Sequence, residues 1–195
     1  INEFVILIFV IVYAAIKKVN LKEVFKLNSP GIIPMILIAV TAVPAYFTAS
    51  ALNSIVVFLL QYIGDIPAEG FPVPQNIPQL LKGIAIIGVL PGICEELMHR
   101  GILLKAYERR GSYKAVAFVA IIFGIFHFDV TNLLGPIFLG VIIGYYVVRT
   151  NSIFAGIWAH FLNNTVATIL QYIWRDEPRS DIITMSPTEL FSNLS

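Results

Sequence analysis

The sequence predicts an all-α, polytopic membrane protein. The chain has 195 residues, of which 57% are hydrophobic and 13% are charged, whereas soluble domains carry about 25% charged residues. The mean hydropathy is +0.82. Long apolar runs are separated by shorter stretches that hold most of the Lys and Arg residues. These observations favour a single helical bundle in the bilayer, with about six spans.

The six predicted spans follow from the apolar runs and their interruptions. Their limits are 4–16, 31–64, 79–110, 113–128, 133–148 and 153–174. Pro34 and Pro44 predict that the second span is tilted or kinked. Pro91 predicts a kink or a broken hydrogen bond in the third span. The prolines of 65–78, which include Pro78, exclude a helix there and predict a loop.

The domain organisation follows from the same pattern. We expect one membrane domain over 1–175, with its catalytic core at 79–174, and a polar tail over 176–195. The connections after spans one, three and five carry most of the Lys and Arg residues, among them Lys17, Arg110 and Arg149, whereas Lys82, Arg175 and Arg179 lie near the other face. Because successive spans alternate in direction, these connections share one face, which the positive-inside rule makes cytoplasmic. The predicted localisation is a multi-pass cell-membrane protein with cytoplasmic basic loops.

The third span carries a polar stretch, Cys94–Arg100, inside an apolar helix. Ionisable groups at membrane depth are costly and indicate function. Glu96 and Arg100 are four residues apart, share a helix face and predict a buried ion pair. Glu95 is then free for chemistry. His99 lies four residues after Glu95, either as a ligand or as its neutral partner.

Two other spans place polar side chains at a similar depth. Glu95 and His160 lie about 15 Å from the basic ends of their helices, and His127 and Asn164 about 20 Å. His160 and Asn164 share a helix face, as do Phe123 and His127. We expect Phe123 to pack beneath the His127 imidazole.

These groups are sufficient for hydrolysis without a covalent intermediate. A carboxylate and a histidine can hold and deprotonate a water molecule. A second histidine and an asparagine amide can stabilise the oxyanion that forms when water attacks a carbonyl group. No serine occupies a suitable position for a nucleophile, and Cys94 is interpreted as a small apolar packing residue.

Three ordered motifs are similar to those of a known family. Glu95-Glu96-x-x-x-Arg100, Phe123-x-x-x-His127 and His160-x-x-x-Asn164 resemble the signature of the CAAX-protease and bacteriocin-processing family, which includes the type II CAAX prenyl endopeptidases. The resemblance implies an intramembrane glutamic endopeptidase with a conical active-site cavity. It also implies the residue roles.

By that resemblance, Glu95 and His127 activate water, and His160 and Asn164 form the oxyanion hole. Glu96, Arg100 and Phe123 support the site. No cofactor is implied. The expected partners are the lipid bilayer and a protein or peptide substrate, of CAAX type or leader-bearing, with or without a lipid, and no nucleic acid. One departure is His99, where the family commonly has an aromatic residue.

Two alternatives remain open. Glu95, His99, His127 and His160 could supply a zinc site with an open position, although no His-Glu-x-x-His helix is present. Buried polar groups also serve non-catalytic membrane proteins such as scaffolds, immunity proteins and small transporters.

Overall fold

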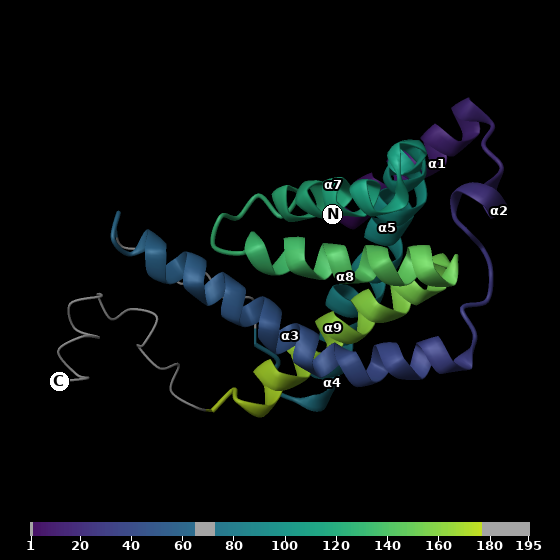
Figure 1. Cartoon of the computed structure of the whole chain (residues 1–195). Helices are drawn as coiled ribbons and strands as arrows, with labels where there is room; N and C mark the ends of the chain where they lie inside the picture. Colours follow the sequence, from purple (N-terminus) through teal and green to yellow (C-terminus); the bar gives the residue numbers. More distant parts are fainter. Residues whose placement is uncertain (1, 65–72, 177–195) are drawn as a thin grey trace.

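A computed structural model describes residues 2–64 and 73–176. Within these ranges the chain is helical and contains no strand. The helices are α1 (Asn2–Lys17), α2 (Leu21–Val24), α3 (Ile32–Leu60), α4 (Ile77–Gly83), α5 (Leu90–Glu96), α6 (Leu104–Tyr107), α7 (Ser112–Ile125), α8 (Leu134–Thr150) and α9 (Ile153–Ile173). Figure 1 shows α7 and α8 side by side, with α3 and α9 below them. The predicted all-α class is confirmed.

The central polar stretch lies on one long, irregular helix. Two π-helical segments, η1 (Ile84–Val89) and η2 (Leu97–Leu103), and a 3₁₀ turn, η3 (Glu108–Arg110), join α4, α5 and α6. Pro91 has no N–H to donate, so it cannot continue the α-helical ladder. The π-helical segment η1 ends two residues before Pro91. The predicted interruption of α-helical hydrogen bonding at this proline is therefore confirmed. The prediction of a loop through Pro78 was wrong, because Pro78 occupies the first turn of α4, where a proline needs no hydrogen bond.

Helices α7 and α8 form a tightly packed hairpin. A Cβ at Gly140 of α8 would lie 2.9 Å from the Cα and Cβ atoms of Ala120 on α7. Glycine at this position therefore permits a close approach of the two backbones. This approach brings the end of α7, with its aromatic residues, next to the long central helix.

The predicted span over 113–128 is too long. Helix α7 ends at Ile125, and His127 lies in the turn that follows. Phe128 has a left-handed φ of 51°, and the Asp129 carboxylate accepts hydrogen bonds from the backbone N–H and the hydroxyl of Thr131. These local interactions compete with helix continuation.

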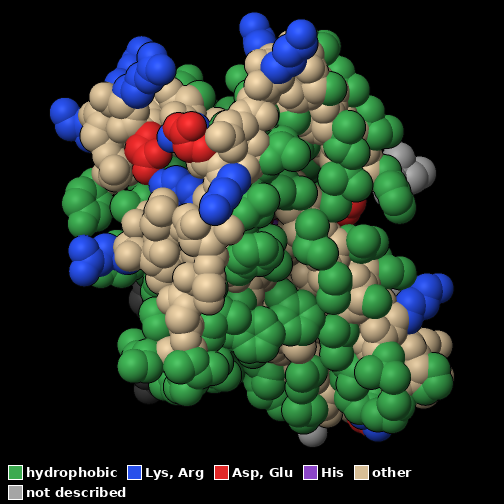
Figure 2. Space-filling model, turned by 90° about the vertical axis from the view of Figure 1, so that its right-hand side faces the viewer, with side chains coloured by type: hydrophobic (Ala, Val, Ile, Leu, Met, Phe, Trp, Pro, Cys, Tyr) green, Lys and Arg blue, Asp and Glu red, His purple; other side chains and the backbone are tan. Residues whose placement is uncertain are grey.

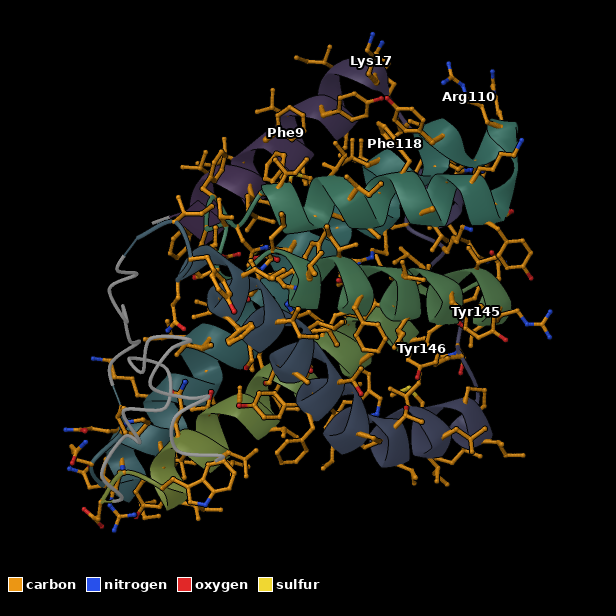
Figure 3. All side chains as sticks on the ribbon, turned by 60° about the vertical axis from the view of Figure 1, so that its left-hand side comes forward. Phe9, Lys17, Arg110, Phe118, Tyr145 and Tyr146 are labelled. Carbon is orange, nitrogen blue, oxygen red and sulfur yellow. The ribbon has the colours of Figure 1, made fainter. Side chains whose placement is uncertain are left out.

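Helix α3 confirms a further prediction. Helix α3 is one 29-residue helix that includes Pro44, as expected for a single long span. Helix α9 packs against α3, α8 and η1. Tyr146 on α8 reaches α3, where its hydroxyl lies 2.8 Å from Thr41 Oγ1; Figure 3 shows Tyr146 beside α3.

The surface is that of a membrane protein. Many large apolar side chains are exposed on α1 and α3, such as Phe4, Ile32 and Val40. Three helices are long and apolar enough to cross a bilayer, namely Ile32–Leu60, Ile77–Arg110 and Ile153–Ile173, and the apolar helices α7 and α8 are shorter. The predicted count of about six spans is not confirmed by these lengths.

The three basic connections meet at one end of the molecule. Lys26 Nζ lies 2.6 Å from Glu108 Oε1, and Lys105 Nζ lies 2.9 Å from Glu23 Oε1. Asn28 donates a hydrogen bond to the carbonyl of Asn151. Figure 2 views this end and shows Lys and Arg side chains gathered on it, and Figure 3 shows Lys17 and Arg110 projecting from the same edge. The cytoplasmic assignment of this end stays a prediction.

The tail predicted over 176–195 lies outside the described residues except for Asp176, and most of the 65–78 loop does as well. The boundary of the predicted catalytic core at 79–174 therefore rests on the sequence motifs.

Candidate active site

One cavity brings together the polar side chains predicted from the three motifs. It measures about 480 Å³ and lies between α1, the long central helix, α7, α8 and α9. Its polar lining consists of Glu3, Glu95, His127, His160, Asn163 and Asn164, and its apolar lining includes Phe123, Ile86, Pro91, Leu139 and Ile143. Three motifs that are separate in the sequence thus share one space. Its conical shape stays a prediction.

The predicted ion pair is the most deeply buried polar contact of this region. Arg100 Nη1 donates to Glu96 Oε1 over 2.7 Å, and both side chains are essentially inaccessible to solvent. Arg100 Nη2 also donates to the carbonyl of Gly140, at 3.1 Å. The pair predicted from the four-residue spacing is confirmed. The hydrogen bond from Arg100 to the Gly140 carbonyl also joins the pair to α8. Gly140 is the residue that lets α7 and α8 pack closely.

Phe123 forms the floor of this network. The Arg100 guanidinium lies 4.7 Å from the centre of its ring, a cation–π contact. The imidazoles of His127 and His160 meet the same ring edge to face, at centroid distances of 5.0 and 5.6 Å. The predicted packing of Phe123 against His127 is confirmed. The ring also contacts Arg100 and His160, which the sequence pattern did not indicate.

His160 is held by Glu96. Its Nδ1 lies 3.0 Å from Glu96 Oε1, the oxygen that also accepts from Arg100. The sequence paired Glu96 with Arg100 only. A carboxylate on Nδ1 fixes the orientation of an imidazole and places its proton on that nitrogen. His160 Nε2 is thereby left for the cavity.

Helix α9 approaches Glu96 closely because Gly156 has no side chain. A Cβ at Gly156 would lie 2.7 Å from Glu96 Oε2 and 2.7 Å from Val147 Cγ2. The glycine one turn before His160 therefore allows the His160–Glu96 contact. Glu96 Oε2 itself is buried and has no hydrogen-bond partner among the described residues.

Asn164 is anchored on the disturbed part of the central helix. Its Nδ2 donates to the carbonyl of Ile87 over 2.8 Å. Ile87 is four residues before Pro91, so its carbonyl lacks the N–H that an α-helix would supply at that position. The proline thus provides the acceptor that orients Asn164. One of the two Nδ2 hydrogens is used in this bond, and an amide carries two.

His127 lines the cavity from the turn after α7. Its Nδ1 is 2.9 Å from the Phe123 carbonyl. A carbonyl oxygen can only accept, so Nδ1 carries the proton, and Nε2 has a lone pair when the imidazole is neutral. The side chain is exposed in the isolated chain. The predicted span placed His127 inside a helix, whereas in the structure it follows the end of α7.

Glu95 faces the cavity from α5 and is partly exposed to it. Glu3 on α1 lines the same cavity. The sequence analysis missed Glu3. The signal that could have identified it was the carboxylate directly before the first apolar run, because charge at the edge of such a run can reach membrane depth, where it indicates function. Asn163, interpreted from the sequence as a packing residue, also lines the cavity.

His99 does not reach the cavity. It is buried, and its Nδ1 donates to the Glu95 carbonyl at 2.9 Å. Its ring packs edge to face on Phe123 and Phe126, with centroid distances of 5.0 and 5.5 Å. This is the packing of an aromatic side chain. Of the four candidate zinc ligands, Glu95, His127 and His160 line the cavity and His99 does not. Within 2–64 and 73–176, no three His, Cys, Asp or Glu side chains are arranged so that they could hold a metal ion.

Comparisons with known proteins agree with the motifs. Residues 77–166 match the family model described as Type II CAAX prenyl endopeptidase Rce1-like. This segment is similar to Rce1-like domains. It contains all the proposed catalytic residues and the whole buried Glu96 network, whereas α1 with Glu3 and α3 lie before it.

A curated relative also aligns with the chain. "Putative membrane peptidase YdiL" from Bacillus subtilis (strain 168) is 30% identical over 117 residues, which are 60% of this chain and 45% of that protein. The chain thus corresponds to less than half of that relative. No solved structure matches the chain. The activity named for that relative is therefore not carried over to this chain by the match.

Proposed function

We propose that the protein is an intramembrane endopeptidase that hydrolyses a peptide bond with an activated water molecule. The observation that supports this most directly is the shared cavity of Glu95, His127, His160 and Asn164 within the Rce1-like segment. In the proposed mechanism, the Glu95 carboxylate is the general base. His127 orients the water through its Nε2 lone pair, which the Nδ1 contact with Phe123 leaves free.

The reaction then proceeds in two steps. An O–H bond of water breaks, its proton passes to Glu95, and the oxygen attacks the carbonyl carbon of the peptide. The oxyanion receives hydrogen bonds from His160 Nε2–H and from the second Nδ2 hydrogen of Asn164. As an imidazolium, His160 donates from Nδ1 to Glu96 and from Nε2 to the oxyanion. The C–N bond breaks as Glu95 returns the proton to the departing nitrogen, which leaves a carboxylic acid and an amine.

The substrate is proposed to be a membrane-associated peptide, either of C-terminal CAAX type or leader-bearing. The cavity is large enough for several side chains, and its apolar walls from Ile86, Leu139 and Ile143 suit a hydrophobic segment. Neither substrate class requires a cofactor in this mechanism.

Hydrolysis of quenched fluorescent peptides by the purified chain in detergent tests this proposal. One probe carries a prenylated C-terminal CAAX sequence, one the same sequence without the lipid, and one a leader sequence. Glu95→Gln and His127→Ala should each lower kcat by about 10²–10⁴-fold, and Asn164→Ala by about 10²–10³-fold. Each variant should keep the helical circular-dichroism spectrum and melting temperature of the parent.

Two results would contradict the proposal. Glu95→Gln with parental activity would remove the proposed base. Inhibition by a chelator, reversed by added zinc, would instead favour the zinc-dependent alternative, since the glutamate mechanism predicts no chelator effect.

A further inference from the structure

A second cavity adjoins the one that holds the proposed catalytic groups. It measures about 270 Å³ and lies between α3, η1, α8, α9 and the connection from α7 to α8. Hydroxyl and carboxamide groups dominate its polar lining, which includes Ser50, Asn132, Asn163 and Gln171. Within 2–64 and 73–176, no Lys, Arg, Asp or Glu lines it. Apart from the His127 imidazole, its polar groups are therefore uncharged.

The two cavities meet at proposed catalytic groups. Asn164 and His127 line both of them, whereas Glu95 and His160 line only the first. A peptide bond placed at Asn164 therefore has space on both sides. The first cavity contributes carboxyl groups, imidazoles and apolar walls, and the second contributes hydroxyls and carboxamides among apolar side chains. The two flanks of a bound peptide thus meet different chemistry.

The wall of the second cavity is held by hydrogen bonds between elements. Asn53 Nδ2 on α3 donates to Asn132 Oδ1 over 2.7 Å, and Asn53 Oδ1 accepts from the backbone N–H of Gly135 at 2.7 Å. A Cβ at Gly135 would lie 2.9 Å from the Ala49 carbonyl oxygen, so α8 begins directly against α3. Figure 1 shows α3 crossing α9 below α8. These contacts fix α3 relative to the connection and to α8.

Several polar groups of the second cavity are left without a protein partner. Asn163 Oδ1 is buried and makes no hydrogen bond to the described residues, although Asn163 Nδ2 donates to Asn164 Oδ1 at 3.4 Å. The side chains of Ser50 and Gln171 also make no hydrogen bond within 2–64 and 73–176. A buried polar atom without a partner is costly. Carboxamides both donate and accept, as a peptide backbone does, so they suit an uncharged peptide segment.

We infer that the second cavity is a substrate subsite, which binds uncharged polar residues on one side of the scissile bond through the carboxamides of Asn132, Asn163 and Gln171. The preferred substrate then has apolar residues on one side of that bond and uncharged polar residues on the other. This inference rests on the proposed function and names the substrate class for it. It gives roles to Ser50 on α3 and to Gln171, which both lie outside the matched segment 77–166.

Cleavage of matched quenched fluorescent peptides tests the inference. The probes share an apolar flank and differ in the other, which is serine–glutamine, leucine–leucine or glutamate–glutamate, and each is made in both chain directions. The parent should cleave the serine–glutamine probe with a kcat/KM about tenfold or more above the others. Gln171→Leu and Ser50→Ala should each lower that value about 2–10-fold and leave the leucine–leucine probe unchanged. Ser54→Ala is the matched control, since Ser54 is exposed one turn further along α3 and bonds its own helix.

A change of preference gives a sharper test than a loss of activity. Gln171→Lys adds a cation to the subsite. It should therefore raise kcat/KM for the glutamate–glutamate probe relative to the serine–glutamine probe by about tenfold or more. Melting temperatures of all variants are compared with the parent. If Gln171→Leu does not fold, Ser50→Ala and Gln171→Lys decide the result.

Binding of the same peptides provides a readout that needs no hydrolysis. Fluorescence anisotropy measures the Kd of each peptide for the parent and for Glu95→Gln, with and without Gln171→Leu. The serine–glutamine peptide should bind more tightly than the others to both proteins. Gln171→Leu should weaken its binding about 2–10-fold.

The outcomes separate this inference from the proposed function. If the parent cleaves the probes without regard to the variable flank, and Gln171→Leu and Gln171→Lys behave like Ser54→Ala, the subsite is wrong and hydrolysis stands. If no probe is cleaved but the serine–glutamine peptide binds selectively through Gln171, the subsite is supported and the endopeptidase function is contradicted. Neither cleavage nor binding would overturn both. Selective cleavage that is lost in Gln171→Leu and redirected in Gln171→Lys supports both.

Discussion

The Glu96 carboxylate links three helices, either directly or through Arg100. It binds Arg100 on its own helix and His160 on α9, and Arg100 continues to the carbonyl of Gly140 on α8. A buried pair of this kind adds little stability compared with a well-packed apolar replacement, yet it is costly to break on one side. Its value lies in fixing His160 relative to the cavity.

Removing one member of this pair should therefore destabilise the protein strongly. Arg100→Met should lower the free energy of unfolding by about 3–5 kcal/mol, because Glu96 is left buried without its cation. The double variant Glu96→Leu/Arg100→Met should be more stable than Arg100→Met alone. Denaturant unfolding in detergent measures both. Lys105→Gln, at an exposed pair, is the control and should show no measurable loss. Equal losses in the single and double variants would contradict this account.

His99 behaves as an aromatic packing residue in the structure. His99→Phe should retain the edge-to-face contacts with Phe123 and Phe126 and change stability by less than about 1.5 kcal/mol. His99→Ala should cost about 3–5 kcal/mol, because it leaves a cavity in the buried core. Thermal unfolding compares the two, and peptide hydrolysis should survive in His99→Phe. Loss of hydrolysis in a folded His99→Phe protein would favour a role for His99 as a ligand.

At the scale of elements, the irregularity of the long central helix determines where Asn164 binds. Pro91 interrupts the α-helical ladder, and the Ile87 carbonyl accepts from Asn164 instead. Interruptions of this kind are frequent at functional sites. The helix is thus less regular where the proposed oxyanion donor is held.

Pro91→Ala should restore the missing N–H and let it compete for the Ile87 carbonyl. We expect a gain in stability of about 1–3 kcal/mol and a loss of hydrolysis of at least about tenfold, since Asn164 loses its anchor. Pro44→Ala in α3, which also has a proline inside a helix, should give the stability gain without the loss of activity. Unfolding and kcat measurements on both variants check this. Full activity in Pro91→Ala would show that Asn164 needs no anchor.

The contact between α9 and the central helix depends on Gly156. Gly156→Ala places a Cβ 2.7 Å from Glu96 Oε2 and Val147 Cγ2, so the helices must separate. We expect a destabilisation of about 1–3 kcal/mol, measured by denaturant unfolding. Gly64→Ala is the control, because its Cβ would have no neighbour within 4 Å. Parental stability in Gly156→Ala would mean that α9 can shift without cost.

At the scale of the whole molecule, the basic end is assembled from three connections that are far apart in the sequence. Contacts between Lys26 and Glu108 and between Asn28 and Asn151 hold it together. The opposite end includes the turn that holds Asp129 and Val130, with no Lys or Arg from 129 to 132. The charge difference between the two ends predicts the orientation in the membrane.

Labelling of single cysteines in intact bacterial cells tests this orientation. In a Cys94→Ala background, Val130→Cys should react with a membrane-impermeant maleimide from outside, because Val130 is exposed in a connection that carries no Lys or Arg. Lys18→Cys at the basic end should react only after permeabilisation. The reverse pattern would overturn the cytoplasmic assignment. Melting temperatures of both variants exclude unfolding as the cause.

The sequence alone was sufficient for features that depend on local spacing or composition. The all-α class follows from the apolar runs, and the Glu96–Arg100 pair follows from residues one helical turn apart. The break before Pro91 follows from its missing N–H. The sequence predicted that α7 ends three residues further along the chain than it does, because the apolar pattern continues past Ile125. The left-handed backbone of Phe128 and the hydrogen bond from Thr131 to the Asp129 carboxylate form a turn there instead.

Only the tertiary structure decided which side chains meet across helices. His160 and Glu96 are 64 residues apart, and Asn164 and Ile87 are 77 residues apart. Whether such residues touch depends on how closely the backbones pack, here through Gly140 and Gly156. The position of Glu3 in the cavity likewise depends on the packing of α1 against α5. The sequence therefore determined the candidate chemical groups, and helix packing determined their partners.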